Sequence, residues 1–168
     1  QRFMFTYHAG LVATHPYASR WWQWLLDLRP ILYYLSYGDG TVSTIGAFVN
    51  PLLCWGGLLA LPVLAYRAWK RDRTALFLLV GYLAQVLPWV FISRLTFEYH
   101  YFAATLFLVL ALGYVLDRLR RRGYLGIVYA FTAANGVLFA LFYPVLTGVT
   151  IPRDYAWNVL KWLPDWPF

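Results

Sequence analysis

The sequence predicts an all-α integral membrane protein with four transmembrane helices. Its composition points there first: 61% of the 168 residues are hydrophobic and only 12% are charged, whereas soluble domains are about a quarter charged. Four apolar segments, at residues 44–66, 75–92, 97–116 and 124–146, are each close to the ~20 residues that cross a bilayer core. Backbone polar groups must bond within the segment in lipid, so we expect helices.

The positive charges form a third observation, and they orient the helices. Eight of the fourteen Lys and Arg residues fall into two clusters between apolar segments: Arg67, Lys70, Arg71 and Arg73, then Arg118, Arg120, Arg121 and Arg122. Cytoplasmic loops carry this kind of excess. We therefore expect the connections 67–74 and 117–123 to be cytoplasmic and both chain ends to be extracytoplasmic. The net charge of +7 then reflects topology, not a nucleic-acid surface.

Residues 1–43 are aromatic but interrupted by polar side chains, so they cannot span a bilayer. Tryptophan is favoured at membrane interfaces, and we expect an external segment with a helix lying at the interface. Gly38-Asp39-Gly40 predicts a turn. The tail 147–168 is expected to form a second external, amphipathic segment, and residues 44–146 the four-helix domain between them.

Contacts between the helices are predicted from small and amide side chains. Small residues allow helices to approach closely, and amides inside helices form hydrogen bonds between them; the alternative for the amides is contact with a substrate. The glycines in question are Gly81, Gly113, Gly126 and Gly136, and the amides are Asn50, Gln85 and Asn135.

The densest polar patch near a membrane boundary runs from residue 93 to residue 102. It contains Arg94, Glu98 and His100, which we place at the external end of the second and third helices. A guanidinium at this depth suits a lipid-linked phosphate. The alternative is an Arg94 side chain that reaches toward water and pairs with Glu98 four residues later. The residues alone leave both readings open.

A second group of polar residues lies in the N-terminal segment. His15, Arg20 and Arg29 alternate there with aromatic residues. They could line a sugar or phosphate pocket, since aromatic faces suit sugar rings and arginine suits phosphate. The alternative is an interfacial anchor whose arginines contact lipid phosphates, and these residues by themselves favour the anchor.

Metal chemistry is not predicted. Cys54 is the only cysteine, which excludes an internal disulfide and a cysteine-based metal site. His8, His15 and His100 do not have the spacing of metal ligands.

Several short motifs occur together in a characteristic order. They are His15-Pro-Tyr-Ala-Ser-Arg-Trp-Trp, Arg29-Pro30-Ile31, Asn50-Pro51, Ser93-Arg94 and Phe97-x-Tyr99-His100-Tyr101-Phe102. This combination resembles the C-terminal four-helix membrane part of the protein O-mannosyltransferases, which use dolichyl- or polyprenyl-phosphate mannose. The chain departs from the family pattern at Val49, where Gly is frequent, and at Ala103, where Pro is frequent.

The resemblance implies a part of a multispan GT-C glycosyltransferase. Such an enzyme transfers mannose from the lipid-phosphate carrier, its substrate, to Ser or Thr of proteins on the extracytoplasmic side, and no cofactor or metal is implied. The acidic catalytic motif belongs to the N-terminal half of the family, so we expect no catalytic residue in this chain. The residues expected to contact carrier phosphate or substrate are Arg94, His100, Tyr99, Tyr101, Glu98, His15, Arg20 and Arg29.

The implied partners are membrane lipid, the lipid-linked mannose donor, an acceptor protein and the N-terminal remainder of the enzyme. The membrane would be the plasma membrane in a bacterium or the endoplasmic reticulum in a eukaryote. Two alternatives remain: a related GT-C enzyme that modifies a lipid or glycan, and a non-catalytic membrane scaffold. A transporter is disfavoured, because its ionisable groups would lie near the bilayer midplane.

Overall fold

The computed structural model describes residues 3, 6–7 and 14–168. Within this part of the chain, four helices are long and apolar enough to cross a membrane, which confirms the predicted fold class. They are α3 (Pro51–Trp69), α4 (Arg73–Val90), α5 (Phe102–Arg121) and α6 (Leu125–Thr147). A 3₁₀ turn, η1 (Glu98–Tyr101), leads directly into α5.

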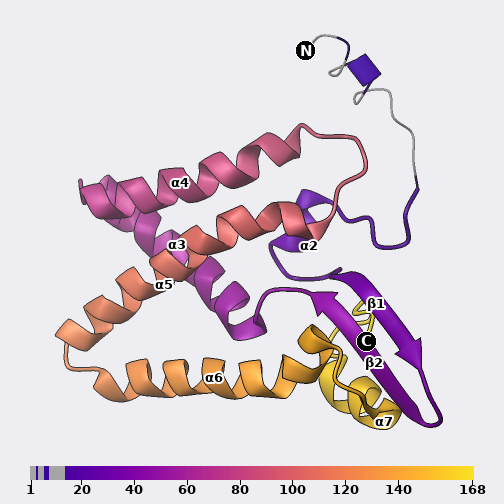
Figure 1. Ribbon diagram of the computed structural model, residues 1–168. Helices are drawn as coiled ribbons and strands as arrows, with labels where there is room; N and C mark the ends of the chain where they lie inside the picture. The colour runs from indigo at the N-terminus through magenta and orange to yellow at the C-terminus, as the bar shows by residue number, and fades with distance from the viewer. Residues whose placement is uncertain (1–2, 4–5, 8–13) are drawn as a thin grey trace.

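The helices divide the molecule into two ends (Figure 1). The α3–α4 and α5–α6 loops, which carry the two basic clusters, lie together at one end. The short helix α2 (Trp21–Trp24), the β-sheet and the C-terminal segment lie at the other end. Helices α3, α4 and α5 pack on one another, whereas α6 packs mainly against the sheet. The predicted candidate-site segments, 15–30 and 93–102, are therefore at the end of the bundle opposite the basic loops.

The N-terminal segment contains a β-hairpin that was not predicted, while the helix expected there is present as the short α2, Trp21–Trp24. Strands β1 (Ile31–Tyr37) and β2 (Thr41–Ala47) pair antiparallel, and β3 (Ile151–Pro152) adds to β2. Both long strands are rich in β-branched and aromatic residues, which favour strands. The predicted turn at Gly38–Gly40 is confirmed, because the backbone groups of Gly38 and Thr41 bond each other across it.

The first membrane helix begins later than predicted, at Pro51 instead of residue 44. Residues 44–47 belong to β2, so the apolar segment in the sequence joins the end of a strand to the beginning of a helix. The Asn50 side chain caps the helix by accepting from the backbone N–H groups of Leu52 and Leu53. Proline is well tolerated at the first helical position, because its missing N–H would have no partner there.

Of the predicted contacts between helices, one amide hydrogen bond and one close approach at a glycine are found. The Asn50 side chain donates a hydrogen bond to the backbone carbonyl of Asn135 on α6, at 3.1 Å. A Cβ at Gly81 would collide with the Phe107 ring, so α4 and α5 do meet closely at this glycine. The prediction is wrong for Gly113, Gly126 and Gly136, each of which faces open space within the described chain.

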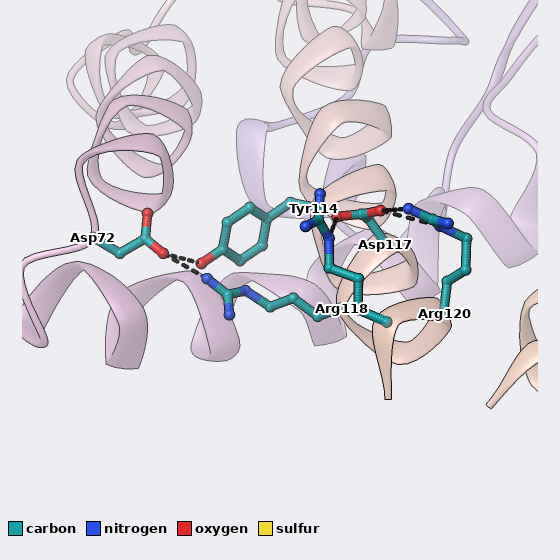
Figure 2. A network of polar contacts seen from close by, with 6 residues as sticks. Asp72, Tyr114, Asp117, Arg118 and Arg120 are labelled. Carbon is teal, nitrogen blue, oxygen red and sulfur yellow. Dashed lines mark hydrogen bonds and ion pairs between the residues drawn. The ribbon is translucent and has the colours of Figure 1, made fainter. Parts of the chain in front are cut away.

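A polar network joins the two basic loops (Figure 2). Asp72 caps α4 by accepting from the backbone N–H of Ala75 at 3.1 Å, while its other oxygen accepts from Tyr114 and Arg118, both at 2.6 Å. These bonds, led by that from the Tyr114 hydroxyl, lower the pKa of Asp72 to about 2. Asp117 binds Arg120 and Arg121 on its own helix instead.

The C-terminal segment is more buried than an amphipathic tail. It forms β3, then α7 (Arg153–Tyr155) and a π-helical turn, η2 (Ala156–Leu160). Trp157 and Trp162 are exposed as expected of an interfacial surface, but Trp166 and Phe168 are buried in a core with residues of β2 and α6. The chain end thus fastens the sheet onto α6.

Candidate functional site

A cleft of about 720 Å³ lies at the end of the bundle opposite the basic loops. Residues 18–23 and Arg29 form one wall, and residues 90–96, which leave the end of α4, form the other. Three of the predicted residues, Arg20, Arg29 and Arg94, line this one cleft. The structure therefore brings together arginines that belong to two separate motifs in the sequence.

Hydrogen bonds between the two walls fix the bottom of the cleft. The backbone N–H of Ser19 donates to the Thr96 carbonyl at 2.9 Å, and the Thr96 hydroxyl donates to the Ser19 carbonyl at 2.6 Å. The Trp24 indole N–H donates to the Ser19 hydroxyl at 2.8 Å. Ser19, Trp24 and Thr96 are all buried, so these bonds are shielded from competing water.

The arginines of the cleft are available to an anion. Arg20 and Arg94 are exposed, and Arg29 is partly buried and donates to the Pro16 carbonyl at 2.9 Å. In the described residues none of the three forms an ion pair with a carboxylate. The alternative in which Arg94 pairs with Glu98 is therefore wrong for this structure. An arginine presents a planar set of N–H donors that matches phosphate oxygens.

The predicted histidines and Tyr99 lie in an aromatic cluster next to the cleft, not in its wall. His100 contacts the rings of Trp89 and Tyr99, each at 4.4 Å between centroids, and stacks on Trp24 at 5.9 Å. His15 meets Phe97 edge to face at 5.0 Å. These rings hold the segment after Thr96 against α2 and the end of α4. His8 lies outside the described residues.

Glu98 and Tyr101 point into the protein interior and do not line the cleft. Tyr101 is buried and its hydroxyl bonds that of Tyr82 on α4 at 2.9 Å. Glu98 is fully buried next to Asp27. No sequence pattern pairs these acids, because Asp27 belongs to an aromatic segment that is typical of a membrane surface.

The fold and the cleft define a class: a polytopic membrane protein with an arginine-lined cleft at the end of its bundle opposite the basic loops. The particular family follows from comparison. The model of the C-terminal four TMM region of protein-O-mannosyltransferase matches residues 1–166, and the chain belongs to this family.

Relatives of known name agree with that assignment. The polyprenol-phosphate-mannose–protein mannosyltransferase of Mycobacterium tuberculosis (strain CDC 1551 / Oshkosh) is 37% identical, over 96% of this chain and 35% of the relative. The protein of the same name from Mycolicibacterium smegmatis (strain ATCC 700084 / mc(2)155) is 33% identical, over 90% of this chain and 33% of the relative. The chain thus spans about a third of the length of these relatives.

A solved structure shares the fold. It is the Saccharomyces cerevisiae protein O-mannosyltransferase Pmt1–Pmt2 complex bound to the sugar donor, with a TM-score of 0.81 and 23% identity. The match covers 99% of this chain and 26% of the yeast chain.

Proposed function

We propose that this chain forms the carrier-phosphate side of a protein O-mannosyltransferase. The enzyme would transfer mannose from polyprenyl- or dolichyl-phosphate mannose to Ser or Thr of proteins on the extracytoplasmic side of the membrane. The observation that carries the proposal is the cleft, where Arg20, Arg29 and Arg94 lie without carboxylate partners. The family assignment and the names of the relatives support the choice of sugar and carrier.

The location of the cleft suits a lipid-linked substrate. One wall continues directly from the last turn of α4, a helix long and apolar enough to cross the membrane. A polyprenyl tail in the bilayer would bring its phosphate to this depth. The positive-inside rule puts the basic loops in the cytoplasm and this end outside, and we extend that orientation to both chain ends.

The chemistry of the transfer explains why arginines would serve here. The acceptor hydroxyl forms a new bond to the anomeric carbon while the bond from that carbon to the phosphate oxygen breaks, and the bonding electrons leave with the phosphate. Negative charge therefore grows on the phosphate in the transition state. Fixed cations near it stabilise that state more than the bound substrate, and such groups typically contribute about 3 kcal/mol, or roughly a hundredfold in rate.

The same reasoning indicates that the general base of the reaction lies outside this chain. Deprotonating the acceptor hydroxyl calls for a general base, and the two carboxyls near the cleft, Asp27 and Glu98, are fully buried. We therefore assign the base to the remainder of the enzyme, together with the acceptor contacts. The lipid-linked sugar is a substrate here, and the proposal needs no cofactor.

Kinetics of the full-length enzyme test the proposal. Arg94→Gln should lower kcat for mannosyl transfer about a hundredfold, while the melting temperature stays unchanged because Arg94 has no ion pair to lose. Arg94→Lys should restore only part of the rate, since lysine keeps the charge but not the planar set of N–H donors. Lys161→Gln removes an exposed charge at the same end of the bundle, outside the cleft, and is the control. Near-normal turnover of Arg94→Gln would refute the proposal.

A further inference from the structure

Two carboxylic acids meet in the interior between the walls of the cleft. Asp27 lies in the loop after α2 and Glu98 begins η1, and both are 0% exposed. Each carboxyl faces that of the other acid, and none of the four buried oxygens has a donor among the described residues. In the described chain neither acid has an ion-pair partner, and no side-chain amide or hydroxyl donates to either carboxyl.

The groups around the pair cannot neutralise two negative charges. Cys54 faces both acids from α3, Tyr101 lies next to Glu98 with its hydroxyl bonded to Tyr82 of α4, and the backbone N–H of Val49 faces Asp27. His100, two residues after Glu98, turns its ring toward Trp24 and Trp89. The described residues of this chain by themselves cover both carboxyls completely. Two adjacent buried carboxyls that lack a cation do not both ionise.

The backbone carrying Asp27 is held in place by its own contacts. Asp27 has a φ of 55°, in the left-handed region that few non-glycine residues adopt. Three donors from elsewhere fix this loop: the Cys54 thiol to Leu25 O at 3.4 Å, the Trp55 indole to Leu26 O at 3.1 Å, and the Trp166 indole to Asp27 O at 2.7 Å. The inward direction of the carboxyl is thus built into the fold.

We propose that Asp27 and Glu98 share one proton, and that the resulting carboxyl–carboxylate hydrogen bond positions the two arginine-bearing walls of the cleft. Asp27 comes two residues before Arg29 in one wall. Glu98 follows the other wall, two residues after Thr96 and four after Arg94. The consequence for sugar-donor binding rests on the proposed function; the shared proton does not. Both acids are positioning residues, since neither reaches the cleft.

The sign of the pH dependence follows from Asp27. Burial, the largest cause, raises its pKa from 3.8 to about 6, although Glu98 and the backbone of Val49 act in the opposite direction. An acid whose pKa is raised by folding adds stability that is complete below the unfolded value and is lost as the pH rises through the folded value. The window thus begins near pH 4 and extends through pH 6, and over it the pair passes from two bound protons to the one that it shares. Cysteine and tyrosine ordinarily titrate above about pH 8, outside it.

Melting curves of the full-length enzyme in detergent, from pH 4.5 to pH 8, test the shared proton without any substrate. We expect the wild type to lose several degrees between pH 4.5 and pH 6.5 and then to melt at a constant temperature up to pH 8, because the one remaining proton stays shared. Glu98→Gln, whose amide donates to Asp27 in place of that proton, should melt with the wild type at pH 7.5. The double variant Asp27→Asn/Glu98→Gln has no acid at this place and should not change over the window. Asp39→Asn, at an exposed carboxyl of the hairpin turn, should follow the wild type. A wild type that continues to lose stability from pH 6.5 to pH 8 would show that both acids ionise and would overturn the shared proton.

The positioning role has its own measurement. Glu98→Ala, which removes the hydrogen bond, should raise KM for the lipid-linked sugar donor with kcat little changed, whereas Glu98→Gln, which keeps a donor for Asp27, should leave KM unchanged. A Glu98→Ala variant that is folded at the assay temperature and keeps the wild-type KM would overturn the positioning role. If Arg94→Gln instead shows that the cleft does not bind the sugar donor, the melting result still stands by itself.

Discussion

Removing the Asp72 carboxylate should weaken the contact between the two basic loops. Asp72 is the one group that caps α4 and also accepts hydrogen bonds from α5, through Tyr114 and Arg118 (Figure 2). Its side chain is only 17% exposed. We therefore expect Asp72→Ala to destabilise the α4–α5 pair at the end where the loops meet.

The magnitude follows from the individual contacts. Loss of a helix cap costs about 1 kcal/mol, and loss of a hydrogen bond between a neutral donor and a charged acceptor about 1.5 kcal/mol. The partly exposed ion pair with Arg118 adds about 0.5 kcal/mol. Asp72→Ala should thus lower the free energy of unfolding by about 3 kcal/mol. Asp72→Asn keeps an acceptor for the cap and should lose about half of that.

Titration of the full-length protein with a denaturing detergent would measure these differences. Asp117→Ala is the matched control, because its partners Arg120 and Arg121 lie on its own helix and its side chain is 41% exposed; exposed pairs of this kind contribute about 0.5 kcal/mol or less. A pKa of about 2 for Asp72 means that its contribution is complete above the ordinary value of 3.8 and is lost as the pH falls through 2. Equal effects of the Asp72 and Asp117 variants at pH 7 would refute the reasoning.

Two further predictions concern helix packing and topology. Gly81→Ala should force the Phe107 ring to move and lower the free energy of unfolding by about 1–2 kcal/mol, whereas Gly136→Ala, which faces open space, should not; equal melting temperatures for the two variants would contradict the α4–α5 contact. In a Cys54→Ala background, a cysteine at Thr74 should be inaccessible to a membrane-impermeant thiol reagent added to intact cells, and its labelling from outside would reverse the predicted orientation.

The membrane helices could be predicted because hydropathy and helix length are local properties of the sequence. The hairpin could not be recognised as easily, since its aromatic residues are also those favoured at membrane interfaces. The buried residues Val42, Thr44 and Gly46 do alternate with more exposed ones along β2, as in other strands, but they are of mixed polarity, so the alternation cannot be seen in the sequence. The length of the first apolar segment concealed the change from strand to helix at Asn50.

The individual residues of the candidate site could be predicted from the sequence, but not which of them lie together. Arginines near a membrane boundary indicated phosphate binding, and the structure places Arg20, Arg29 and Arg94 around one cleft. Glu98 faces Asp27 instead of pairing with Arg94, which depends on how the loop after α2 packs against η1. Such a contact joins residues far apart in the chain, so no local pattern reveals it.

Phosphate recognition by the cleft is the central claim, and binding of two carrier lipids to the full-length enzyme tests it most directly. The wild type should bind a polyprenyl phosphate much more tightly than the matching polyprenol, and Lys161→Gln should keep this preference. The double variant Arg20→Gln/Arg94→Gln should lose about a hundredfold or more of its affinity for the phosphate, if each lost charge-assisted contact contributes 1.5–3 kcal/mol, and should bind the polyprenol unchanged. A double variant that retains the full preference for the phosphate would show that these arginines do not hold it.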